Sequence, residues 1–426
     1  MVAWWLLKGW AGGGNSHFIT GGFNYQQTKG LVNVKLKWVK DRVLDSVVAG
    51  GRELRAVSLL VSIIASNPQC CVPLYHFSRC RGQLGLPQNT KISTFTRKYP
   101  SIFEEVHLPN NGGTRVPWFR LTPQALSLHQ EEVRVVEECQ MGLVDRLRKL
   151  LMLTKDRTLP LQTIDQLKWD LGLPFDYMNS LILQYPELFS VVSLPDNRFG
   201  LKLLVWDDGF AVSQLEKNAL VQGREGDGRN GTLAFSIGFT RGFGLKRKCM
   251  EWLEEWQKLP YTSPYTDSSH LDPRTDVSEK RIVGVFHELL HLTIQKKTER
   301  KNVSNLRKPL DLPQKFTKVF ERHPGIFYIS KKCDTQTVVL REAYDRHRLI
   351  EKHPLTDIRE RYASLMEKGF VDRSRGLYKK NKCEGLEEDP LERISGGELS
   401  GFQYEGESDD YRYSEYESDK TMDNSC

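Results

Sequence analysis

The chain has 426 residues, of which 39% are hydrophobic, so it can bury one large core or two to three smaller ones, and wholesale disorder is excluded. It contains no run of about eighteen apolar residues, which argues against a membrane span. The net charge of +7 is unevenly distributed: residues 384–426 carry a net charge of −11, and residues 1–383 a net charge of +18. A body as basic as residues 1–383 suits a polyanionic partner.

The first forty residues contain five lysines and no acidic residue, and the first carboxylate is that of Asp41. Met1–Trp10 can form a short amphipathic helix, which Gly12–Gly14 would end early. A basic, acid-free and partly amphipathic start is typical of an organellar transit peptide, which we assign to residues 1–33. We expect import into the mitochondrion, with the chloroplast as the alternative.

One short motif occurs three times: an aromatic residue or histidine, then proline, any residue, isoleucine or leucine, and phenylalanine. Its copies are residues 99–103, 185–189 and 323–327. A Leu-Gly-Leu-Pro or Leu-Asp-Leu-Pro turn precedes each copy, at residues 84–87, 171–174 and 310–313. Similar spacing of several motifs indicates an internal repeat. The predicted units lie around residues 55–130, 145–215 and 280–350.

Each unit is predicted to contain a helix, a turn, a second helix and a β-hairpin. The prolines that should begin the second helix are Pro87, Pro174 and Pro313. The prolines that should end it are Pro100, Pro186 and Pro324. The phenylalanine that closes each motif is expected to pack back as a hydrophobic anchor.

Two β-rich runs follow each motif and flank a turn, at residues 110–113, 195–197 and 331–336. The predicted fold class is therefore α+β, mainly helical, with three repeated helix–turn–helix–β-hairpin units that are winged-helix-like.

The segments between and beyond these units have their own composition. The glycine-rich residues 222–231 predict a flexible loop, and the proline-rich residues 260–277 predict an extended connection. Residues 371–426 form an acidic tail that we expect to be disordered. The eight cysteines include no C-x-x-C pair, so neither a zinc ribbon nor a disulfide framework is indicated.

The repeated motifs, together with Trp252–Pro264, His287–Thr293 and Lys296–Arg300, resemble the plant organelle RNA recognition family, which includes the "what's this factor" and root primordium defective proteins. The resemblance spans about residues 34–370, which we take as the domain. It implies a non-catalytic protein that binds organellar transcripts and promotes splicing of group II introns, in mitochondria or chloroplasts. It assigns no individual RNA-binding residue.

A competing motif is His287-Glu288-Leu289-Leu290-His291, which matches H-E-x-x-H. On a helix this pattern places two imidazoles on one face, beside a glutamate that can serve as general base for a zinc-bound water. The conceivable third ligands are Glu299, Glu321 and His323. The second unit has Arg148, Lys149 and Met152 at the equivalent positions, which favours helix packing. We therefore expect no metal and no cofactor.

Three basic clusters are the candidate RNA-binding sites, with a solvated helix face as the plain alternative for each. The first contains Arg241, Lys246, Arg247 and Lys248, interleaved with Phe239 and Phe243. The second contains Lys296, Lys297, Arg300, Lys301, Arg307 and Lys308. The third is expected on a helix after the third hairpin and contains Arg341, Arg346, His347, Arg348 and Lys352, with Arg346 and Arg348 as its candidate contacts.

The sequence thus predicts a non-enzymatic, organellar RNA-binding protein that promotes group II intron splicing. Its expected partners are single-stranded or structured organellar RNA and other organellar splicing factors, with no membrane. The alternatives are a zinc-dependent hydrolase that uses His287, Glu288 and His291, and a scaffold that binds proteins but not RNA.

Overall fold

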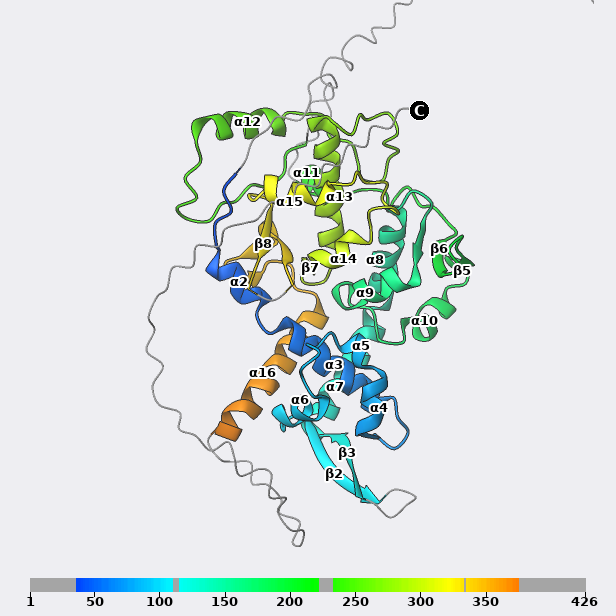
Figure 1. The fold of residues 1–426 in the computed structure, drawn as a ribbon. Coiled ribbons are helices and arrows are strands. Elements are labelled where there is room, and N and C mark those ends of the chain that lie inside the picture. The colour runs from blue at the N-terminus through cyan, green and yellow to red at the C-terminus, as the bar shows by residue number, and fades with distance from the viewer. Residues whose placement is uncertain (1–35, 110–114, 222–232, 333–334, 375–426) are drawn as a thin grey trace, which may run out of the picture. The chain divides into compact units, whose positions relative to one another are not determined.

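The computed structural model describes residues 36–109, 115–221, 233–332 and 335–374, which form a mixed α and β structure with three small antiparallel three-stranded sheets (Figure 1). The predicted transit peptide, the turn at residues 110–113, the loop at 222–231 and nearly all of the acidic tail lie outside the described residues. Among the helices within these ranges, none has the length and apolar character needed to cross a membrane.

The elements follow one another as helices interrupted by hairpins. The first part contains α2 (Arg42–Val48), α3 (Gly51–Ala65), β1 (Cys71–Pro73), α4 (Leu74–Arg79), α5 (Arg81–Leu84), α6 (Ile92–Lys98), β2 (Phe103–Pro109), β3 (Arg115–Leu121) and α7 (Pro123–Glu138). The second contains α8 (Gln140–Met152), β4 (Thr158–Pro160), α9 (Leu161–Leu171), α10 (Tyr177–Ser180), η1 (Ile182–Gln184), β5 (Phe189–Ser193), β6 (Phe199–Leu203), α11 (Gln214–Val221) and α12 (Arg247–Gln257). The third contains α13 (Asp276–Leu292), β7 (Lys297–Glu299), α14 (Arg300–Ser304), η2 (Phe316–Lys318), α15 (Val319–Arg322), β8 (Phe327–Ser330), β9 (Thr337–Leu340), η3 (Arg341–Ala343), β10 (Tyr344–Asp345), β11 (Arg348–Leu349) and α16 (Pro354–Ser374).

Each three-stranded sheet joins a three-residue strand to a hairpin, and the short strand always pairs with the second strand of that hairpin. The orders are β1-β3-β2, β4-β6-β5 and β7-β9-β8, and all pairings are antiparallel. In the third hairpin, Phe327 lies opposite Leu340 and Ser330 lies opposite Thr337. The predicted hairpins are confirmed, whereas the short first strands are additional to the prediction.

The residue before each short strand has a left-handed backbone conformation: φ is 48° at Cys70, 52° at Arg157 and 50° at Lys296. The residue two positions before each of Pro87, Pro174 and Pro313 is also left-handed, with φ of 65° at Gly85, 80° at Gly172 and 51° at Asp311. Glycine adopts this conformation without steric cost, and aspartate tolerates it. Corresponding positions in the three parts therefore turn the chain in the same way.

The two sets of prolines have different outcomes. The helices before the second set end at Lys98, Gln184 and Arg322, two residues ahead of each proline, so the predicted helix ends are confirmed. The first set does not begin helices. The carbonyls of Pro87, Pro174 and Pro313 accept hydrogen bonds from the amides of Thr90, Tyr177 and Phe316, so these prolines lie in a turn that precedes the helix.

Two large hydrophobic cores and one small cluster hold the described residues together, the small one formed by α2 and the third hairpin. One large core contains side chains from α3, α6, the first sheet, α7 and the C-terminal helix α16, which packs against α3 and α7 (Figure 1). The larger core contains side chains from α8, α9, α13 and the second and third sheets. The predicted anchors Phe103, Phe189 and Phe327 are at most 4% exposed, which confirms their role. Their burial fixes each hairpin against the helix before it.

Candidate nucleic-acid interface

The first basic cluster lies at the start of α12 and in the loop that precedes it. Arg241, Lys246, Arg247 and Lys248 are all exposed to solvent. Arg247 forms a surface ion pair with Glu251 at 2.8 Å, and α12 has no acidic residue in its first turn. Positive side chains at the positive end of a helix are unfavourable by about 0.3–1 kcal/mol each, so a bound anion would relieve this repulsion.

The aromatic residues within this cluster pack against the protein body. The rings of Phe239 and Phe243 lie 4.6 Å apart, and Phe239 packs over the backbone of Gly325. Both are partly buried, and Phe239 lies against the larger core. The cluster therefore offers charge to a nucleic acid, while these two rings serve packing.

The second cluster is divided between the surface and the interior. Lys296 is only 6% exposed, and its ammonium donates a 2.7 Å hydrogen bond to the carbonyl of His291. Burial lowers the pKa of Lys296 to about 8. Its predicted role as an RNA contact does not fit this structure, because the left-handed turn before β7 directs its side chain inward, where the ammonium binds the last turn of α13.

The other members of the second cluster are more accessible. Lys297 is half-buried and donates to the carbonyl of Val47 at 2.6 Å. Arg300 pairs with Glu321 at 3.1 Å, and Lys301 pairs with Glu299 at 2.7 Å. Arg307 is half-buried, whereas Lys308 is exposed. Ion pairs with neighbouring carboxylates reduce the charge available to phosphates, so Lys308 is the most available cation of this group.

The third cluster does not lie on one helix, which corrects the prediction for this segment: Arg341 begins the short helix η3, and the other members follow it. Arg346 and Arg348 are exposed on the small antiparallel ribbon of β10 and β11, and Arg346 has φ of 57° in its turn. Arg341 is instead held inside the molecule by Asp41 at 2.9 Å and by the carbonyl of Pro324 at 2.6 Å. Arg346 and Arg348 make no ion pair with any described residue.

Two clefts open next to α3 and α16, but their charges balance. One, of about 660 Å³, is lined by parts of α3, α16 and the third sheet. The other, of about 1040 Å³, is lined by parts of α3, α7, α9 and α14. Five basic and five acidic side chains line each cleft. The clefts therefore add no net positive charge to the surface.

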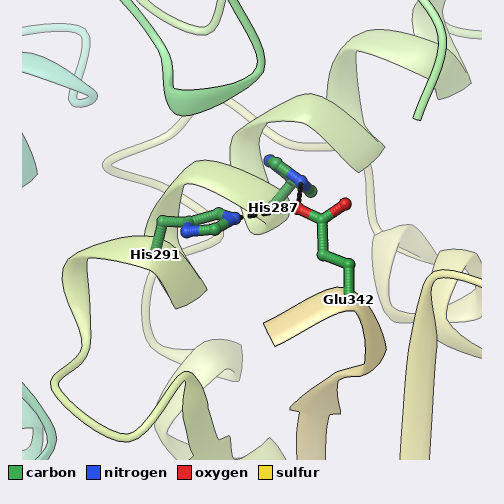
Figure 2. Close-up of side chains that lie close together, drawn as sticks. All are labelled: His287, His291 and Glu342. Carbon is green, nitrogen blue, oxygen red and sulfur yellow. Dashed lines mark hydrogen bonds and ion pairs between the residues drawn. The ribbon is translucent and has the colours of Figure 1, made fainter. Parts of the chain in front are cut away.

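The two histidines of the H-E-x-x-H motif lie on one face of α13, and both face Glu342 of η3 (Figure 2). The Nε2 atoms of His287 and His291 lie 2.6 Å and 3.0 Å from the same oxygen, Oε1 of Glu342. Burial alone would raise the pKa of Glu342, but the hydrogen bonds from the two imidazoles bring it well below its usual range. Glu342 was not among the predicted third ligands.

The three conceivable third ligands are all engaged elsewhere. Glu299 pairs with Lys301, and Glu321 pairs with Arg300. His323 is buried against Glu279 at 2.7 Å. None of them contacts His287 or His291 among the described residues. Glu342 is 51 residues from His291 in the sequence and follows β9, so the packing of the third sheet against α13 brings it to the histidines.

Glu288, the residue that would act as general base in a hydrolase, points away from the two histidines to other partners. Its Oε1 accepts hydrogen bonds from Nζ of Lys149 and from the hydroxyl of Tyr265, both at 2.7 Å. Its Oε2 accepts from the amide of Gln214 at 2.6 Å. Burial alone would raise the pKa of Glu288, but the charge of Lys149 and these hydrogen bonds lower it. The carboxylate therefore joins α8 to α13 and has no free oxygen beside His287 or His291.

Comparison with known proteins identifies the family. The plant organelle RNA recognition domain matches residues 39–371. The chain is 39% identical over 346 residues to the mitochondrial protein WHAT'S THIS FACTOR 9 of Arabidopsis thaliana, covering 81% of this chain and 88% of that protein. It is 32% identical over 362 residues to the chloroplastic WHAT'S THIS FACTOR 1 of Zea mays, covering 84% and 72%. It is 30% identical over 339 residues to ROOT PRIMORDIUM DEFECTIVE 1 of Arabidopsis thaliana, covering 77% and 82%. No solved structure matches the chain.

A basic body with exposed lysines and arginines, matched over most of its length by an RNA recognition domain, defines an RNA-binding protein of the plant organelle class. The chain belongs to the plant organelle RNA recognition family. The family is known for RNA binding and not for enzymatic activity. The resemblance in the repeated motifs therefore pointed to the correct family.

Proposed function

We propose that this protein binds group II intron RNA in plant mitochondria and promotes its splicing, while the chemistry is left to the RNA. The observation that carries the proposal is the match of the RNA recognition domain to residues 39–371, which cover nearly all of the described chain. The net charge of +18 on residues 1–383 supports it, because a polyanion gains affinity by releasing counterions from its phosphates.

The phosphate contacts are proposed on the exposed basic residues. The start of α12 is the best supported, since Lys246 and Lys248 repel its helix dipole in the absence of an anion, while Arg247 beside them pairs only with the exposed Glu251 among the described residues. Lys308 and the ribbon residues Arg346 and Arg348 extend the set, together with Arg241. Lys297, Arg300, Lys301 and Arg307 would contribute less, because most of them already bind protein groups or are half-buried. Lys296 is not part of the proposed surface.

We propose that residues 34–370 form the RNA-binding domain and that its three units are winged-helix-like. The shared strand order of the three sheets and the shared left-handed positions support this arrangement. The β-hairpins, which would be the wings of these units, differ in accessibility. The strands β8 and β9 are buried throughout, whereas β2 and β3 are largely accessible. The first unit's hairpin could therefore reach an RNA, while the third serves the core. Residues 1–33 would be a transit peptide and residues 371–426 an acidic tail.

The mitochondrion is proposed as the location because WHAT'S THIS FACTOR 9, a mitochondrial protein, shares 39% identity with the chain, whereas the chloroplastic relatives share 32–33%. The test is to express an epitope-tagged chain in plants, separate mitochondria from plastids, crosslink, precipitate and sequence the bound RNA. Enrichment of mitochondrial group II introns is expected. Enrichment of plastid introns alone would reassign the organelle, and no enrichment over a tag-only control would contradict the RNA-binding function.

A further inference from the structure

The His287–His291–Glu342 cluster takes no part in the proposed RNA contacts, yet it gathers three metal-ligating groups in one place. Each offers one ligand atom, and these atoms lie within 4.8 Å of one another (Figure 2). The side chains are 1%, 11% and 14% exposed, respectively. The cluster is thus largely buried, and His291 and Glu342 retain slight access to solvent.

The backbone presents these ligands rigidly. Spacing of i and i+4 places both imidazoles on one face of α13, and 14 of the 17 residues of this helix are buried. Glu342 lies in η3 between two anchored neighbours. On one side, Arg341 is held by Asp41 and Pro324, and on the other the hydroxyl of Tyr344 donates to the carbonyl of Gln295. Ligands fixed in this way lose little conformational entropy on binding an ion.

The donor types select the class of ion. Two imidazole nitrogens and one carboxylate suit zinc and its neighbours in the first transition series, whereas magnesium and calcium prefer sites made of oxygen ligands. Zinc bonds to nitrogen and oxygen are about 2.0–2.2 Å long, so ligand atoms of a tetrahedral site lie about 3.3 Å apart. The observed separations of 2.6 Å and 3.0 Å would have to widen by about 0.7 Å and about 0.3 Å to reach this value, which a shift of the Glu342 side chain away from α13 would supply.

We propose that His287, His291 and Glu342 bind one zinc-class divalent ion through the two Nε2 atoms and the Glu342 carboxylate, with solvent at the fourth position. The ion would join α13 to η3 and so fix the base of the ribbon that carries Arg346 and Arg348. The site is structural and not hydrolytic, because Glu288 is occupied by Lys149, Tyr265 and Gln214.

The surroundings also set the expected strength of binding. An imidazole that binds metal through Nε2 carries its proton on Nδ1, and Nδ1 of His291 is buried without a hydrogen-bond partner among the described residues. Metal sites that lack such an outer partner typically lose about 10–100-fold in affinity. We therefore expect binding that is specific but weaker than in a site whose histidines are both supported, and removable by a chelator.

The test uses the full chain, purified without a polyhistidine tag and treated with EDTA. Cobalt(II) is titrated in as a spectroscopic substitute for zinc, and the stoichiometry is measured by equilibrium dialysis. The expected result is about one equivalent of cobalt with the visible absorption of a four-coordinate ion, no thiolate charge-transfer band, and displacement by zinc. Absence of this absorption at any cobalt concentration that leaves the protein soluble would overturn the proposal.

Two variants locate the ion, and a third serves as the matched control. Glu342→Gln and His291→Gln should each abolish the cobalt spectrum, whereas His323→Gln, which removes another buried histidine paired to a glutamate of α13, should keep it. Circular dichroism verifies that each variant is folded. If a variant unfolds, a zinc-dependent rise in the melting temperature of the unaltered chain, absent with magnesium, supplies the second readout. Equal cobalt binding by the unaltered chain and all three variants would show an adventitious ion elsewhere and refute the site. A thiolate charge-transfer band would refute it as well, because it would show that a cysteine binds the ion.

Discussion

The buried ion pair between Lys149 and Glu288 gives the sharpest test of whether Glu288 is structural or catalytic. The Glu288 side chain is 1% exposed and accepts three hydrogen bonds, from Lys149, Tyr265 and Gln214. Glu288→Leu would leave the Lys149 ammonium buried, with the carbonyl of Val212 at 2.9 Å and the ring of Tyr265 as its remaining contacts in the described part of the chain. Breaking a buried pair from one side typically costs about 3–5 kcal/mol, a large part of a total stability of about 5–15 kcal/mol.

The same reasoning predicts strong coupling between the two partners. Lys149→Met should also cost about 3–5 kcal/mol, because it leaves a buried carboxylate. The double variant removes both charges, so its cost should be smaller than the sum of the two single costs by about 2–3 kcal/mol. Lys155→Ala is the matched control, since the pair of Lys155 with Asp311 is 67% and 66% exposed and should contribute at most about 1 kcal/mol.

The assay is urea unfolding of the full chain, followed by far-ultraviolet circular dichroism and by tryptophan fluorescence. Trp252 and Trp256, two of the nine tryptophans of the chain, lie in the same core as α8 and α13 and contribute to this fluorescence. Free energies are compared only if the two probes give coincident transitions. Additive single costs, or a Glu288→Leu variant as stable as the Lys155→Ala control, would refute the structural role of Glu288.

Two further predictions concern α13 and the third motif. A Cβ atom on Gly325 would lie 2.6 Å from Ile237 and 2.9 Å from Phe239. Gly325→Ala should therefore lower the unfolding free energy by about 1–3 kcal/mol. Gly238→Ala is the control and should change it little, because a Cβ atom on Gly238 meets no atom nearby. Thermal melts of the two variants decide this, and equal melting temperatures would contradict the packing. Burial lowers the pKa of Lys280 to about 7, below its value in an unfolded chain. Above pH 7 the unfolded state therefore binds more protons at this residue than the folded state does. The contribution of Lys280 to the unfolding free energy should rise between about pH 7 and 10. Lys280→Met should reduce that slope by up to about 1.4 kcal/mol per pH unit, and an unchanged slope in urea titrations would show that Lys280 stays charged.

Sequence patterns located the features that depend on local chemistry. The prolines at 100, 186 and 324 end helices because the residue before proline avoids the helical conformation, and the phenylalanines that follow are buried as anchors. The short strands β1, β4 and β7 were missed because three residues carry no alternation that distinguishes a strand from a turn. Their existence depends on pairing with a hairpin strand that comes later in the sequence.

The candidate site shows a similar division. Charge clustering identified the exposed residues at the start of α12, but the same signal placed Lys296 on the surface, although its left-handed turn buries it. The H-E-x-x-H spacing identified two imidazoles on one helix face, but neither the engagement of Glu288 by Lys149 nor the approach of Glu342 could be predicted from it. Both contacts join segments that are distant in sequence, so they follow from the packing of α8 and η3 against α13.

In the function proposed above, exposed cations of the body bind RNA through its phosphates. This is decided by the dissociation constant of the purified full chain for a group II intron RNA, measured as a function of salt concentration. The Lys246→Ala, Arg247→Ala, Lys248→Ala triple variant is measured in the same way. Affinity should fall steeply with salt, and the triple variant should reduce the logarithmic slope by about 2. A chain that binds no RNA at low ionic strength, or binds with an affinity that salt does not change, would contradict the claim.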